Sequence, residues 1–346
     1  MRIKKYVIGS LLTLFSTFGY AQTDTTKAPV EELNFEEFGD ADDKKIRTYC
    51  TQKVSYLSPT KLISIGYEGQ LPFHLASSGP HGLGRPITTT AETHVNAFGG
   101  LRLAANVPVI SRSNFILNLG LTHWNTRATL ANPERSAGLF GSLGSLNSTG
   151  INATIFKPFD NQHFLIVQAS ADFNYTRTDV LNPKGLTYSG TAIFGWKKND
   201  NLMWGLGVTR TYRAGQLLHI PVIFYNRTFN KKWGVEAIFP ARVHLRRNFS
   251  PTSYLMAGYE IEGNAYYLGN PLGSDLYLRR GELKPRIMFE KKLTGFVWLS
   301  AQVGLRYNWR FDVFSTQNPV KDQKPLFENT LGNPLYFNVS VNLVSP

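Results

Sequence analysis

The sequence predicts an all-β protein that forms a transmembrane antiparallel up-and-down β-barrel. The first observation is the strict alternation in residues 296–310, where every odd-numbered residue from Val297 to Trp309 is apolar and the even-numbered residues from Ser300 on are polar or Gly. Successive side chains of a strand point to opposite faces, so this strand has one apolar and one polar face. The second observation is its length, which suffices to cross a bilayer at the tilt of a barrel strand. The third is that similar segments recur along the chain.

The first 21 residues have the features of a secretory signal peptide. Basic residues near the start precede the short apolar stretch of residues 6–18, and Gly19-Tyr20-Ala21 has the small-x-small form of a cleavage site. We therefore expect residues 1–21 to be removed and the mature chain to begin at Gln22, outside the cytoplasm. The predicted localisation is the cell outer membrane.

Charge divides the mature chain into two predicted parts. Residues 22–43 contain eight acidic residues and one Lys, with few apolar residues, so residues 22–56 are predicted to be a disordered acidic arm. Residues 57–346 are predicted to be the barrel, and they are basic. Because the chain is secreted, nucleic acid is not an expected partner. The expected partners are outer-membrane lipid, lipopolysaccharide phosphates or small anionic solutes, and the barrel-assembly machinery.

Alternating segments predict the strands. They lie near residues 60–71, 89–109, 113–124, 144–157, 163–176, 186–197, 201–212, 217–228, 232–245, 253–267, 280–290, 296–310 and 335–344. Single-chain bacterial barrels have even strand numbers, so we expect about twelve strands, with fourteen as the alternative. The alternation runs through Pro240, which we place inside the segment 232–245 at a bulge or at a position where its missing N–H is tolerated.

A water-soluble β-sandwich also has alternating strands, but its apolar faces are hidden inside. Three features favour the membrane barrel: long charged side chains on the polar faces, many strands without helices to cover a sheet, and aromatic residues near strand ends, as in interfacial girdles. The girdle candidates are Trp124, Tyr175, Trp196, Trp204, Tyr212, Tyr225, Trp233, Tyr254, Tyr307 and Trp309.

The polar faces predict which charged residues line the lumen. Two basic ladders are expected, one along the strand carrying Arg242 and one formed by Arg306 and Arg310. If acidic residues pair with them, the charges form a salt-bridged plug; if they stay unpaired, they line a pore that favours anions. The predicted lumen-lining residues are Arg102, Arg210, Glu236, Arg242, His244, Arg246, Glu260, Glu262, Arg286, Arg306 and Arg310.

Four sequence stretches resemble a known protein group. They are residues 195–200 (GWKKND), 204–207 (WGLG), 221–226 (PVIFYN) and 233–241 (WGVEAIFPA). On these stretches the chain resembles the outer-membrane β-barrel proteins of Gram-negative bacteria, and more narrowly an uncharacterised group of them defined by a domain of unknown function. The resemblance spans about residues 50–344. It implies an outer-membrane barrel and supplies no catalytic residues to assign to this chain. Many such barrels end on an aromatic residue, whereas this chain ends Leu343-Val344-Ser345-Pro346.

No motif for catalysis, cofactors or metal ions stands out. The sequence has no P-loop, no Gly-x-Ser-x-Gly and no His-Glu-x-x-His. His163 and Ser170 share one segment but have opposite parity, which places them on opposite faces. We therefore expect no enzyme and no cofactor. The leading hypothesis is a channel or small-solute transporter with a basic lumen. The alternative is a closed structural or surface-interaction barrel, and the third hypothesis is an envelope lipid hydrolase.

Overall fold

The computed structural model describes residues 48–79, 91–132, 145–176, 182–270, 272–320 and 322–345. The chain divides into residues 1–46 and residues 47–346, and everything below concerns the second unit. The predicted signal peptide and most of the predicted acidic arm lie outside the described residues.

The described residues form β-strands and one short 3₁₀ turn, Pro183–Gly185. No helix in this part of the chain is long and apolar enough to cross a bilayer. The strands are β1 (Lys61–Gln70), β2 (Phe73–Ser78), β3 (Ala91–Arg112), β4 (Phe115–Leu130), β5 (Ser145–Pro158), β6 (His163–Tyr175), β7 (Leu186–Asn199), β8 (Leu202–Thr211), β9 (Leu218–Thr228), β10 (Trp233–Phe239), β11 (Arg242–Ser250), β12 (Ser253–Gly269), β13 (Leu276–Thr294), β14 (Val297–Leu305), β15 (Tyr307–Phe314), β16 (Glu328–Leu331) and β17 (Leu335–Val344).

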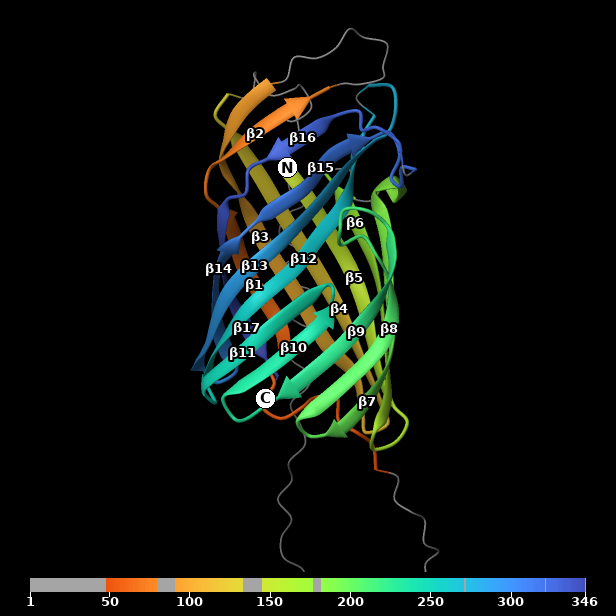
Figure 1. The fold of residues 1–346 in the computed structure, drawn as a ribbon, viewed down its shortest axis with the longest axis vertical. Coiled ribbons are helices and arrows are strands. Elements are labelled where there is room, and N and C mark those ends of the chain that lie inside the picture. The colour runs from red at the N-terminus through yellow and green to blue at the C-terminus, as the bar shows by residue number, and fades with distance from the viewer. Residues whose placement is uncertain are drawn as a thin grey trace, which may run out of the picture. The chain divides into compact units, whose positions relative to one another are not determined.

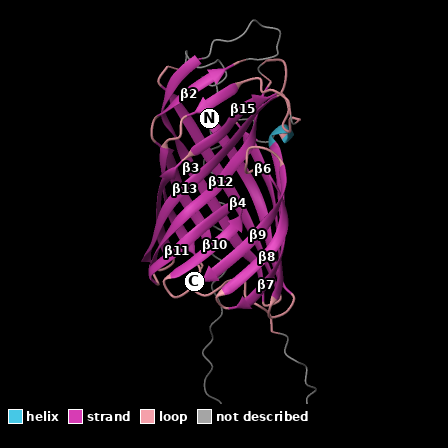
Figure 2. Cartoon of the chain, viewed as in Figure 1, coloured by secondary structure: helices cyan, strands magenta, loops and turns pink. Residues whose placement is uncertain are grey.

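These segments close into one antiparallel barrel (Figures 1 and 2). β3 to β14 follow one another around the wall, β14 pairs with β17, and β1 closes the ring between β17 and β3. At one end β2 continues β1, β15 continues β14, and β16 precedes β17, with β2 paired to both β3 and β16. When β1 with β2, β14 with β15, and β16 with β17 are each counted as one continuous strand, the described residues form a closed barrel of fourteen strands. The fourteen-strand alternative is confirmed, and the expectation of twelve is wrong.

The missed strand lies within the predicted segment 232–245. This segment is the end of one hairpin strand and the start of the next, because β10 ends at Phe239, β11 begins at Arg242, and Pro240 and Ala241 form the turn. Ile238 pairs with Arg242, so even-numbered residues have the same orientation on both strands. The alternation therefore passes through the turn without a break, so the pattern of apolar and polar residues does not reveal the turn. Pro240 is a turn residue and not a bulge.

The two ends of the barrel differ. At one end six short turns join the strands, at residues 113–114, 159–162, 200–201, 229–232, 251–252 and 295–296. We call this the short-turn end. The connections at the other end, the long-loop end, are longer except for the turn at 240–241, and β2, β15 and β16 extend the wall there (Figure 1).

The outer wall is apolar around most of the ring. Its exposed side chains include Val208 on β8 (66% exposed), Ile151 on β5 (63%) and Val303 on β14 (60%). Others lie on β1, β3, β4, β9, β13 and β17: Ile65, Tyr67, Leu101, Val107, Leu119, Leu121, Ile223, Ile287, Phe289, Val339 and Val341. An apolar surface this extensive is rare on soluble monomers.

The interior is apolar near both ends, which the sequence patterns did not predict. Near the long-loop end, a cluster contains Phe73, Leu75 and Leu331 from the extension strands, together with Phe98 and Phe311. Near the short-turn end, a second cluster contains Phe156, Phe164, Ile193, Met203, Val222 and Phe224. Polar and charged side chains lie between the two clusters.

Candidate functional site in the lumen

A belt of buried charges crosses the middle of the lumen and centres on Glu68 of β1. The Glu68 carboxylate accepts hydrogen bonds from Arg102 of β3 (2.6 Å), from Lys284 of β13 (2.8 Å) and from Arg306, which joins β14 to β15. Three cations around one carboxylate leave a positive excess, which a second carboxylate reduces. Glu262 of β12 supplies it, at 3.1 Å from both Arg102 and Lys284.

A third carboxylate extends the belt toward the long-loop end. Glu282 of β13 lies 3.0 Å from Arg280 and 3.4 Å from Arg306. The Arg280 guanidinium lies over the ring of Phe98, a member of the apolar cluster above it. Below, Tyr336 of β17 presents its ring to Lys284. Each described cation of this belt thus has a carboxylate partner, which is the salt-bridged plug that the sequence left as one of two alternatives.

Below the belt lies a polar cavity of about 560 Å³. Its charged lining consists of four cationic side chains and two carboxylates, besides His244: Lys61, Arg102, Arg242, Arg286, Glu236 and Glu290. Hydroxyl and amide side chains, among them Ser64, Asn106, Gln302 and Asn338, line it together with apolar side chains such as Phe224, Ile238, Met256 and Met288, and Trp124 supplies an aromatic ring. The lining is therefore of mixed polarity, and its charged side chains have an excess of positive charge.

Residues 48–60, which we call the N-terminal plug segment, cover the cavity at the short-turn end. Cys50 and Val54 are buried in the apolar cluster of that end. The Cys50 amide donates to the carbonyl of Asp160, and the Ser55 amide donates to that of Asp200, so two short turns hold the segment. Ser58 donates to the Glu236 carboxylate through both its amide (3.1 Å) and its hydroxyl (2.7 Å). Glu236 is in turn 3.1 Å from Arg246.

The barrel wall is lowest beside Arg242, because β10 and β11 end at the turn 240–241 while β12 continues to Gly269. Residues 212–217 fill the space next to the upper half of β12. A Cβ on Gly263 would lie 2.5 Å from the carbonyl oxygen of Arg213, so only Gly permits this close approach. Arg213, half exposed, reaches Glu260 at 3.3 Å. This loop therefore packs against β12 and reaches Glu260, the cross-strand partner of Arg242.

The structure brings together most of the predicted lumen-lining residues. Six of them belong to the pairs and belt described above: Arg102, Glu236, Arg246, Glu260, Glu262 and Arg306. Arg286 pairs with Glu260 at 2.5 Å, and its guanidinium lies 3.4 Å from Nε2 of His244. Arg242 lines the cavity, but no carboxylate of the described residues lies within ion-pair distance of it.

Two predicted lumen residues lie elsewhere. Arg210 has the parity of Leu206 and Val208, which are exposed on the outer wall, and it donates to the carbonyl of Tyr188. Arg310 alternates with the inward Phe311 and Val313, and it donates to Gln216 at 2.6 Å. A register shift between β13 and β15 reverses the alternation before Phe311, so Arg306 and Arg310 do not form a ladder.

Sequence reasoning missed Glu282, Lys284 and Glu290 as lumen residues. All three lie at even positions of the predicted segment 280–290, as does Arg286, so the parity signal was present. Lys61 and Tyr336 were missed because they lie where a predicted segment begins. Among the described residues, no group of three or more His, Cys, Asp or Glu side chains is arranged to hold a metal ion.

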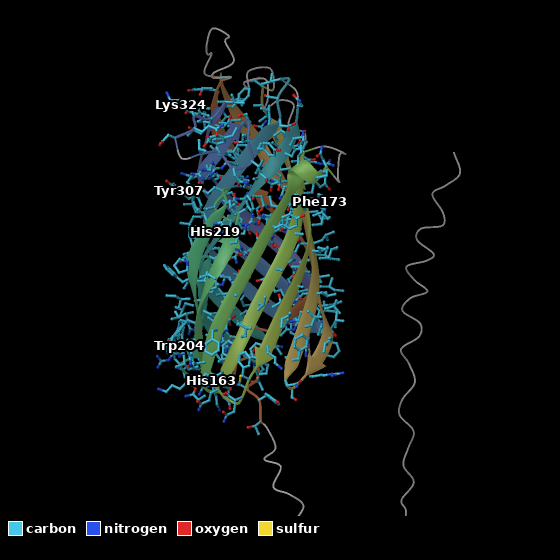
Figure 3. The ribbon with its side chains drawn as sticks, turned by 90° about the vertical axis from the view of Figure 1, so that its right-hand side faces the viewer. His163, Phe173, Trp204, His219, Tyr307 and Lys324 are labelled. Atoms are coloured by element: carbon cyan, nitrogen blue, oxygen red, sulfur yellow. The ribbon has the colours of Figure 1, made fainter. Side chains whose placement is uncertain are left out.

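The predicted aromatic girdle is partly right. On the outer wall near the short-turn end, Trp196 stacks on Trp204 with ring centroids 4.6 Å apart, close to His163 and Phe194 (Figure 3). Tyr307 is exposed toward the other end of the wall. Trp124 and Tyr254 instead line the cavity, and Tyr212 is buried. Parity, and not closeness to a strand end, decides which aromatic residues face outward.

A family model described as Domain of unknown function (DUF6268) matches residues 112–342, from the end of β3 to β17. The chain belongs to this family. The membership agrees with the resemblance that the four sequence stretches indicated. A search of the curated proteins found no match.

Several solved structures are similar to this family member at low identity. An outer-membrane channel from Pseudomonas putida F1 is 13% identical, over 84% of this chain and 97% of that one, with a TM-score of 0.38. A FadL homologue from Pseudomonas aeruginosa is 9% identical, over 84% and 91% of the two chains, with a TM-score of 0.39. The toluene transporter TodX from Pseudomonas putida is 11% identical, over 86% and 95%, with a TM-score of 0.30.

Proposed function

We propose that this protein is an integral outer-membrane β-barrel that admits small solutes through its lumen and that the structure represents its closed state. The observation that carries the proposal is the polar cavity of about 560 Å³, enclosed in a barrel whose outer wall is apolar. An apolar outer face and a polar interior are the arrangement of membrane barrels and the reverse of soluble ones. Short turns face the periplasm in such barrels, so the plug segment would lie on the periplasmic side.

Two features support closure. The charge belt and the apolar cluster above it fill the lumen toward the long-loop end, and residues 48–60 cover the cavity at the short-turn end. For the lumen to open, either the charge belt with its apolar cluster or the plug segment must move. The plug segment is the easier one to move, because a limited set of hydrogen bonds and two buried side chains hold it, whereas the belt is built from residues of the wall strands themselves.

The belt also favours a second function, a closed structural barrel. Paired charges that span the lumen stabilise the barrel without any transport. The two functions differ in one measurable property, since only a channel conducts ions when its closures are weakened.

Planar-bilayer recording of the full mature chain tests the proposal. We expect wild-type protein to open rarely and the variant Val54→Asp to open about tenfold more often, because a charge in the apolar cluster disfavours the docked plug segment by more than ~1.4 kcal/mol. Heat-modifiable migration on gels verifies that each preparation is folded. The matched control is Val320→Asp, at an exposed loop position. A folded barrel that stays silent in both wild type and Val54→Asp would identify the structural barrel instead.

A further inference from the structure

We propose that the lumen cavity is a binding site for a small organic anion and that Arg242 is the residue that binds its charged group. This inference rests on the proposed function and names the solute class that the cavity takes.

Ion pairing distinguishes Arg242 from the cations that pair with carboxylates in the lumen. Arg102, Arg246, Arg280, Lys284, Arg286, Arg306 and Lys61 each lie within ion-pair distance of a carboxylate. Arg242 lies within this distance of no described carboxylate, and its side chain is exposed to the cavity that it lines. Inside a barrel, an arginine without a fixed counter-charge is available to an anionic ligand, to which it can donate two parallel hydrogen bonds.

The neighbours of Arg242 also favour an anionic ligand at this position. Its cross-strand partner Glu260 is already engaged by Arg286 (2.5 Å) and Arg213 (3.3 Å). Arg242 is therefore a third guanidinium beside a carboxylate that already has two ion-pair partners, and the local charge stays positive. A solute carboxylate or phosphate beside Arg242 would reduce this excess.

The rest of the lining indicates the body of the ligand. Hydroxyl and amide side chains of the cavity, among them Ser64, Gln302 and Asn338, share the lining with apolar side chains such as Ile238, the cross-strand neighbour of Arg242. Trp124 adds an aromatic ring, over which the Arg102 guanidinium lies at 4.6 Å. Hydroxyl and amide groups donate to and accept from a hydroxylated solute, and aromatic faces pack against its C–H groups. The volume of about 560 Å³ falls within the range of small-molecule sites. A hydroxylated carboxylic acid has both a charged group for Arg242 and hydroxyl groups for the polar side chains of the lining.

Calorimetric titration of the full mature protein in detergent tests the site, with gluconate as the probe. Sorbitol is the matched neutral probe, since it has a hydroxymethyl group where gluconate has its carboxylate. We expect saturable binding of gluconate, no measurable binding of sorbitol, and at least about tenfold weaker gluconate binding in Arg242→Gln. Arg242→Lys should retain part of the affinity, because the charge remains but the two-pronged geometry is lost. Inorganic phosphate is titrated in parallel and shows whether the charged group alone suffices.

The control variant is Arg247→Gln on the same strand. Arg247 points to the outer face, where it stacks on Trp233 and Phe249. Equal binding of gluconate and sorbitol, or equal loss in Arg242→Gln and Arg247→Gln, would overturn the inference. Conductance without saturable gluconate binding would refute the anion site while leaving the channel intact. Binding by a barrel that never conducts would refute the channel and leave the site.

Discussion

At the residue scale, one carboxylate organises the centre of the lumen. Glu68 is 6% exposed and contacts three cations from three parts of the wall. A buried charge without its partner is strongly unfavourable, so the belt depends on the whole set being present. This explains how charged side chains that lie far apart in the sequence, from Glu68 to Arg306, can be buried close together.

Removal of the Glu68 charge should destabilise the barrel. We expect Glu68→Gln to lower the free energy of unfolding by about 3 kcal/mol, because Arg102, Lys284 and Arg306 lose a shared counter-charge. Urea unfolding of the protein in lipid vesicles measures this. The matched control is Glu92→Gln, whose side chain is exposed on β3 and lies 3.4 Å from His74; it should change the free energy by less than about 0.5 kcal/mol. If both variants were as stable as wild type, the belt would not hold the barrel together.

At the scale of elements, the N-terminal plug segment packs into the short-turn end of the barrel through Cys50 and Val54. Lys197 at the end of β7 reinforces the docking by donating to the Thr51 hydroxyl (2.5 Å) and the Lys53 carbonyl (3.2 Å). Burial raises the pKa of the Cys50 thiol, against the opposing effect of nearby Lys197. Less thiolate is therefore present at neutral pH, and a docked segment also hides the thiol from reagents.

Cys50 thus serves as a natural reporter of plug docking, since it is the chain's single cysteine. We expect maleimide to label wild-type protein slowly and Val54→Asp about tenfold faster, because undocking exposes the thiol and restores its ordinary pKa. Mass spectrometry follows the labelling. Wild-type labelling as fast as that of urea-unfolded protein would show that the segment is not docked in solution.

At the scale of the whole molecule, the outer wall requires apolar side chains and the lumen accommodates polar ones, so neighbouring residues of one strand differ in polarity. Val303 is exposed on the outer wall, while the adjacent Gln302 lines the cavity. The same substitution at these two positions therefore separates the lipid-facing surface from the lumen.

We expect Val303→Arg to destabilise the barrel in vesicles by ~2–4 kcal/mol, the penalty for Arg on the lipid face. Gln302→Arg should cost less than about 1 kcal/mol, because the lumen side chain stays solvated. Unfolding titrations in lipid vesicles measure both values. A larger loss for Gln302→Arg than for Val303→Arg would contradict the assignment of the outer wall to the membrane.

The sequence by itself determined the barrel, the face of most strand residues and the mixture of charges inside, because side-chain alternation is a local property of each strand. Only the tertiary structure decided the strand number, since the turn at Pro240 preserves the parity on both of its sides. It also decided that Arg310 leaves the lumen, because a register shift reverses the alternation, and that Arg242, unlike Arg246 and Arg286, has no carboxylate of the described residues within ion-pair distance. Pairing depends on distances between strands far apart in the sequence, which no single-strand pattern contains.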